Sequence, residues 1–82
     1  MKRGILYQNK KHQPAAVAVA MAKREYEVAS HTQGFPAKEV YFNPDEAPEE
    51  AVISGLTVYT DRSIKPGHIR VTTNVVEYAE AI

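Results

Sequence analysis

Residues 15–30 read AAVAVAMAKREYEVAS and predict the main helix of this 82-residue chain. Alanine is the best helix former, and neither glycine nor proline interrupts the run. Pro14 suits the first turn of a helix, where its missing N–H costs nothing. A stripe of Val17, Met21 and Val28 runs beside a second stripe of alanine, valine and tyrosine. Together the two stripes form a broad apolar face that we expect to pack against a sheet.

Four short segments around this helix are typical of strands, and they cover residues 4–8, 39–42, 56–60 and 68–73. The last two are rich in β-branched residues and alternate in polarity. The element order predicts a small two-layer α+β domain, with a mixed sheet of about four strands and the helix on one face. The first two strands have the spacing of a right-handed crossover. We expect the last two to pair antiparallel across a loop at 61–67.

Two segments leave alternatives open. Residues 43–47 read NPDEA, and the first four have the spacing of a capping box, but Pro48 would then interrupt the helix. We therefore expect a turn over 43–47 and a short helix over 48–55, with a strand starting at Ala51 as the alternative. For residues 74–82, a last helical turn and an extension of the preceding strand are both open.

The composition is that of one ordinary globular domain over residues 1–82, with 44% hydrophobic and 24% charged residues. The chain has no cysteine, which excludes disulfides, thiolate metal sites and a cysteine nucleophile, and suits the cytoplasm. The apolar run over 15–22 is too short to span a membrane and is a weak match to a signal peptide. We therefore expect a cytoplasmic protein with no membrane partner.

The formal net charge of zero conceals a strong segregation of charge along the chain. Residues 1–24 carry six bases and no acid, residues 25–61 carry eight acids and one base, and residues 62–82 carry three bases and two acids. Such asymmetry bears on partners and not on fold. The densest acidic cluster is explained by the preference of carboxylates for helix starts, so we expect no metal site there. Its members are Asp45, Glu46, Glu49 and Glu50.

The basic loop before the main helix is the most specific local feature. Lys10, Lys11 and His12 would lie beside the N-terminal end of the helix, where free N–H groups and the helix dipole favour an anion. Lys2 and Arg3 add to the positive charge nearby. We therefore predict that this segment binds an anion or an acidic partner.

Three tyrosines fall on the expected strands and predict a second binding surface. Tyr7, Tyr41 and Tyr59 could lie on the sheet face that the single helix leaves uncovered. Aromatic side chains on such a face bring a large contact area at a small cost in entropy. We expect this face to contact another protein.

These features predict a non-catalytic protein–protein interaction module, similar in size and lack of motifs to small adaptors and phage-encoded inhibitors, and able to self-associate as a homodimer. The alternative is a nucleic-acid-binding module that uses the basic N-terminal segment, including Lys23 and Arg24, although the isoelectric point of about 6.8 is low for that class. A histidine-based hydrolase or nuclease is a third hypothesis. It would need His12, His31 or His68 beside an acid. No catalytic motif appears, and we expect neither enzyme activity nor a cofactor.

Overall fold

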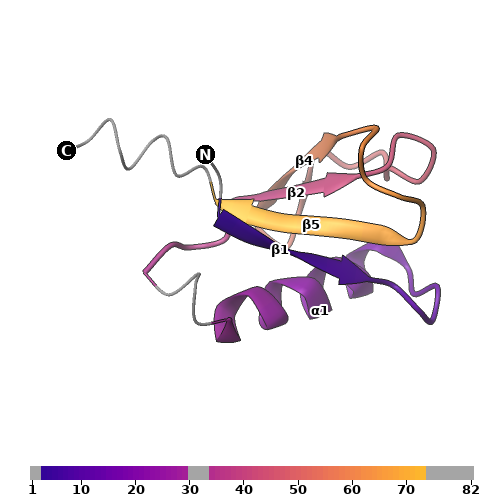
Figure 1. The fold of residues 1–82 in the computed structure, drawn as a ribbon. Coiled ribbons are helices and arrows are strands. Elements are labelled where there is room, and N and C mark those ends of the chain that lie inside the picture. Colours follow the sequence, from indigo (N-terminus) through magenta and orange to yellow (C-terminus); the bar gives the residue numbers. More distant parts are fainter. Residues whose placement is uncertain (1–2, 30–33, 74–82) are drawn as a thin grey trace.

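The computed structural model describes residues 3–29 and 34–73, and shows one helix packed against a five-stranded mixed sheet (Figure 1). The elements are β1 (Arg3–Gln8), α1 (Ala15–Val28), β2 (Glu39–Phe42), β3 (Val52–Ile53), β4 (Leu56–Thr60) and β5 (His68–Thr73). The strands lie in the order β1-β5-β2-β4-β3. The expected small α+β domain with one helix on a mixed sheet is confirmed, with five strands instead of about four.

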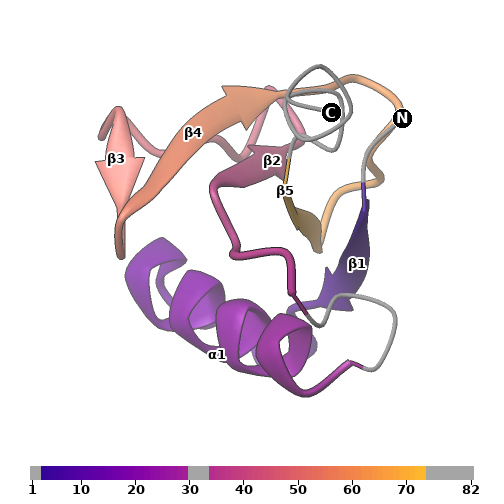
Figure 2. The same ribbon diagram turned by 90° about the vertical axis from the view of Figure 1, so that its left-hand side faces the viewer.

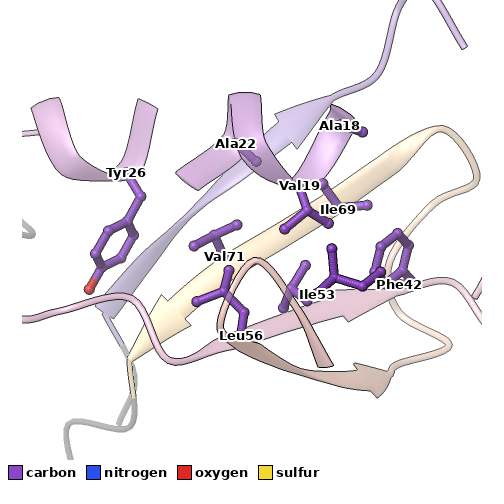
Figure 3. Close-up of a cluster of buried hydrophobic side chains, with 10 residues drawn as sticks. Ala18, Val19, Ala22, Tyr26, Phe42, Ile53, Leu56, Ile69 and Val71 are labelled. Carbon is purple, nitrogen blue, oxygen red and sulfur yellow. The ribbon is translucent and has the colours of Figure 1, made fainter. Parts of the chain in front are cut away.

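The core lies between α1 and the sheet face that it covers (Figure 3). The sheet curves around the helix, with β1 and β3 at its two ends (Figure 2). Small side chains on α1 allow the helix to lie close to the sheet. The Tyr26 hydroxyl also donates a hydrogen bond to the Phe35 carbonyl oxygen at 2.7 Å. The buried core comprises Ala18, Val19, Ala22 and Tyr26 from α1, and Val40, Phe42, Ile53, Leu56, Ile69 and Val71 from the sheet.

Only one of the two apolar stripes expected on the helix is buried. Val17, Met21 and Val28 remain 42%, 44% and 74% exposed, because the sheet lies on the other side of α1. The helix also ends at Val28 instead of continuing to Ser30, and Ala29 is already extended. The broad apolar face was therefore predicted too wide. A single sheet layer covers only part of a helix circumference.

The short helix expected over 48–55 is wrong, and the alternative strand is nearer to the structure. Val52 and Ile53 form β3, which pairs antiparallel with β4 across a two-residue turn. Both turn residues have positive φ, 52° at Ser54 and 80° at Gly55, which is the requirement of a type I′ hairpin. The turn expected over 43–47 is confirmed. The Asn43 Oδ1 accepts the Asp45 N–H at 2.8 Å there.

The pairing of the last two strands was also predicted wrongly. Strand β4 pairs parallel with β2, whereas β5 lies between β1 and β2 and is antiparallel to both. The connection over 61–67 therefore passes the end of β2. The Asp61 N–H donates to the Phe42 carbonyl at 2.9 Å, and Asn43 Nδ2 donates to the Ile64 carbonyl at 2.9 Å. The alternatives for 74–82 lie outside the described residues.

Candidate functional site

The sheet face opposite α1, which we call the open face, carries a row of large side chains across four strands. The register places Tyr59 beside Tyr41, Tyr41 beside Arg70, and Arg70 beside Leu6. Side chains directly opposite each other on paired strands share a face. No helix among the described residues covers this row, since α1 packs on the other side (Figure 2). The open face therefore presents two aromatic rings, a guanidinium group and a leucine together.

The two tyrosines of this row support each other. The rings of Tyr41 and Tyr59 are stacked, with centroids 5.2 Å apart and planes at 22°. The Tyr41 hydroxyl donates to Glu39 Oε1 at 3.2 Å, while Tyr59 remains 42% exposed. An aromatic pair contributes about 0.5–1.5 kcal/mol beyond the burial of its area. This pair therefore holds a large surface in a fixed orientation before any partner arrives.

Two shallow hollows adjoin along the open face. The larger, of about 400 Å³, lies towards Tyr41 and Thr72, and the smaller, of about 200 Å³, lies towards Ile64 and Lys65. Leu6 and Arg70 line both hollows. Hollows of this kind accept the side chains by which a partner anchors itself in an interface.

The charges around these hollows are mixed, with more positive charge on the side of the smaller one. Arg70 and Lys65 are exposed, and the partly exposed His68 lines the same hollow. Asp61 lines the larger hollow, and its Oδ1 accepts the N–H of Ser63 at 2.8 Å and the hydroxyl of Ser63 at 2.7 Å. That carboxylate is therefore already engaged in shaping the connection between β4 and β5.

The expected tyrosine surface needs one correction. Tyr41 and Tyr59 lie on the open face, but Tyr7 lies on the side that α1 covers, where it packs against the core. Its hydroxyl is 3.5 Å from the Met21 sulfur. Tyr7 faces the helix because it pairs with the core residue Ile69. Alternation along β1 instead places Leu6 on the open face.

The expected anion site is divided between two hollows at the start of α1. Lys10 and Lys11 line one of about 270 Å³ together with Tyr7 and Met21. His12 lines the other, of about 220 Å³. The structure therefore does not gather the three residues around one pocket.

The loop that carries them is held by local contacts. Asn9 makes two hydrogen bonds of 2.9 Å to the backbone of Gln13, and His12 adopts a positive φ of 50°. Arg3 begins β1, but its side chain is not described, and Lys2 lies outside the described residues. The loop precedes α1 as expected, and whether it binds an anion stays a prediction.

The bases of the nucleic-acid hypothesis are spread over the molecule. Lys10 and Lys11 precede α1, whereas Lys23 and Arg24 lie about 12 Å further along its axis. Lys23 Nζ donates to the Ser54 carbonyl at 3.2 Å, at the turn between β3 and β4. The structure thus separates these bases into two sites along α1, and whether they bind nucleic acid stays a prediction.

Two of the three histidines line the same hollow. His12 and His68 share the hollow at the start of α1 with Glu46, whose Oε1 accepts the Gly67 N–H at 2.6 Å. The His68 Nδ1 lies 3.2 Å from the Pro66 carbonyl oxygen. The Glu46 carboxylate and the His68 ring thus both contact the connection between β4 and β5. His31 lies outside the described residues.

The sequence reasoning missed Leu6 and Arg70, which complete the row on the open face. Both could have been found from alternation, because each lies between two apolar residues of its strand. Recognising that they lie side by side required the pairing of β1 with β5. That pairing joins residues sixty or more positions apart.

Searches for a metal site, a membrane-spanning helix and similar proteins assign no further chemistry to this surface. Within residues 3–29 and 34–73, no cluster of histidines and carboxylates is arranged to hold a metal ion. The same residues contain no helix with the length and apolar character needed to cross a bilayer. No known protein family matches the chain, and no curated protein or solved structure is significantly similar to it.

Proposed function

We propose that this chain is a small non-catalytic interaction module that binds another protein through the open face. The observation that carries the proposal is the row of Leu6, Arg70, Tyr41 and Tyr59 on a sheet face that no described helix covers. Tyrosine and arginine are among the residues that contribute most to binding energy in protein interfaces. The row combines both with an exposed leucine.

The preformed geometry of the row supports the same function. Tyr41 and Tyr59 are stacked before binding, so fewer rotamers are lost when a partner docks. The two hollows beside Leu6 and Arg70 would receive anchoring side chains of that partner. Arg70 can donate hydrogen bonds from the rim, which favours a partner with carboxylates or carbonyl groups at that point.

The test compares partner capture by matched variants. Tagged chain, the double variant Tyr41→Ser with Tyr59→Ser, and the control Val28→Ser are incubated with extract of the source cell. Val28 is 74% exposed on α1, outside the open face. We expect the double variant to lose at least about tenfold in captured partner, as expected when two interface tyrosines are truncated. The control should capture as much partner as the parent.

Three measurements separate this function from its alternatives. Urea unfolding must show that the double variant is folded, and sedimentation of the purified chain reports self-association. Capture that disappears after nuclease treatment, or binding to DNA or RNA that weakens steeply with salt, would support the nucleic-acid hypothesis instead. Equal capture by the folded double variant and the parent would remove the open face as the binding surface.

A further inference from the structure

The two edges of the sheet differ in how much backbone they leave available. Strand β3 forms one edge and has only two residues. Strand β1 forms the other edge with six residues, and in the described part of the chain it pairs only with β5 (Figure 1). A short edge strand offers little to an incoming strand, whereas a long one is a template for pairing. The edge that can accept another strand is therefore β1.

The hydrogen bonds at the end of β1 show which of its backbone groups point outward. The Asn9 N–H donates to the Gly67 carbonyl at 2.8 Å and so extends the antiparallel ladder with β5. Bonded pairs alternate along such a ladder, so Tyr7 and Ile5 also direct their N–H and C=O groups towards β5. The N–H groups of Leu6 and Gln8 then point away from the sheet. These outward groups could bond a strand added beside β1.

After Arg3, strand β1 lacks the usual protection of an exposed edge. Natural edge strands carry lysine, proline or a bulge that prevents further pairing. Residues 4–8 read GILYQ and contain neither a charge nor a proline. Their pairing with β5 is continuous in register and has no bulge. The edge is thus uncharged over residues 4–8 and continuous in register, which suits it to pairing.

Both sides of this edge offer contacts to the side chains of an added strand. On the open face, Leu6 is 55% exposed. On the helix side, Tyr7 and Met21 line the hollow of about 270 Å³. Met21 is 44% exposed and belongs to the helix stripe that the sheet leaves uncovered. Successive side chains of an added strand would alternate between these two surfaces.

The charges around the edge select the kind of strand. Lys10 and Lys11 line the hollow and are exposed, and Glu25 is the one carboxylate lining it. The first twenty-four residues, which include all of β1, contain six bases and no acid. We propose that β1 binds an extended acidic segment of another protein as an added strand, with apolar side chains against Leu6 and Met21 and carboxylates near Lys10 and Lys11.

A second copy of this chain is a poorer occupant of the same edge. Antiparallel pairing of β1 with β1 would bring Lys10 and Lys11 of one copy beside Lys2 and Arg3 at the start of the other strand. Parallel pairing would bring identical lysines together. Like charges across paired strands are destabilising. An acidic segment replaces this repulsion with attraction.

The first experiment selects random 12-residue peptides, displayed on phage, against the intact chain. The proposal predicts enrichment of peptides with alternating apolar residues and several carboxylates. The strongest peptide is then synthesised and added to ¹⁵N-labelled chain. Hydrogen exchange at the Leu6 and Gln8 amides should slow by about fivefold or more in the complex, because each becomes bonded. Enrichment of no peptide or of basic peptides, or unchanged exchange at both amides, would overturn the proposal.

The second experiment removes one outward N–H while keeping the pairing with β5. Gln8→Pro and Gln8→Ala both remove the side-chain amide of glutamine, but only Gln8→Pro removes the backbone N–H. Proline is tolerated where the N–H of an edge strand faces outward. The selected peptide should bind Gln8→Pro at least about fivefold more weakly than Gln8→Ala. Leu6→Pro and Leu6→Ala form a second matched pair. If proline and alanine variants that remain folded bind alike, strand addition is wrong.

The same peptide distinguishes this surface from the open face. Because the added strand lies beside β1, the double variant Tyr41→Ser with Tyr59→Ser should bind it within about threefold of the parent, while its capture of the partner of the open face is lost. Loss of peptide binding in that variant would place the peptide on the open face and overturn the proposal. A dimer in sedimentation that Gln8→Pro dissociates would make the occupant a second copy instead.

Discussion

The same strands place buried apolar residues on the face that α1 covers and more exposed residues on the open face. On β5, Ile69 and Val71 point towards α1 and are 4% and 0% exposed, whereas Arg70 between them points to the open face and is exposed. On β2, Val40 and Phe42 are buried while Tyr41 between them joins the aromatic pair. Since α1 is the one helix in the described part of the chain, the face that it covers supplies most of the apolar burial there. The other face carries the binding surface that we propose.

The largest effect on the free energy of unfolding should come from replacing a leucine on the covered face, compared with a leucine on the open face. Leu56 lies on the covered face and is 1% exposed, and Leu6 lies on the open face and is 55% exposed. We expect Leu56→Ala to lower the free energy of unfolding by about 2–5 kcal/mol, because it leaves a cavity in the core. Leu6→Ala should change it by less than about 1 kcal/mol. Urea unfolding of the three proteins measures both differences.

The result would also be informative if the two effects were similar. A large loss for Leu6→Ala would mean that the open face contributes to folding as the core does. The face would then be a second packed surface and not a binding surface. A small loss for Leu56→Ala would mean that the pairing of β3 with β4 leaves this side chain accessible, contrary to its burial in the core.

A smaller loss of unfolding free energy is expected when a side chain is added at Gly4, where β1 and β5 lie close together at one end of the open face. A Cβ added at Gly4 would collide with the Val71 carbonyl oxygen and lie 2.7 Å from the Thr72 Cβ. We expect Gly4→Ala to cost about 1–3 kcal/mol of unfolding free energy, because β1 and β5 must separate to make room. Gln8→Ala, on the same strand and face, is the control and should be nearly neutral. An unaffected Gly4→Ala protein would show that the two strands pack less closely at this point.

The elements of this fold were largely predictable from local sequence, and their neighbours were not. Residues 39–42, 56–60 and 68–73 were predicted with the bounds that β2, β4 and β5 have. Alternation and β-branched residues are local signals, so they suffice for such segments. The strand order depends on β5 pairing with β1, and no local pattern in either strand records that choice.

Which residues lie on strands could be predicted from local sequence, but the face that each occupies depends on strand pairing. The sequence indicated aromatic residues on strands, and Tyr41 and Tyr59 do share the open face. Tyr7 was placed on the wrong face because its orientation depends on which register β1 adopts against β5. The hairpin at Ser54 and Gly55 was missed although a Ser-Gly pair is a turn signal. The apolar residues around it fit a helix equally well.

The smallest difference between the faces concerns two neighbouring threonines at the end of β5. Thr72 lies on the open face and Thr73 on the covered face, and both are 0% exposed. The Thr72 hydroxyl donates to the Thr73 carbonyl at 3.1 Å, whereas Thr73 Oγ1 has no hydrogen-bond partner among the residues that the structure describes. A buried polar atom without a partner costs free energy that an apolar isostere avoids.

Replacing each threonine by valine should therefore act in opposite directions. We expect Thr72→Val to lower the free energy of unfolding by about 1 kcal/mol, because it removes a buried hydrogen bond and leaves the Thr73 carbonyl with one donor fewer. Thr73→Val should leave it unchanged or raise it by up to about 1 kcal/mol, because the methyl group fills the same volume without the orphaned hydroxyl. Urea unfolding of the two variants at one pH measures the difference. A destabilised Thr73→Val protein would mean that this hydroxyl is bonded in solution, and that the covered face accommodates a polar contact at its end as the open face does.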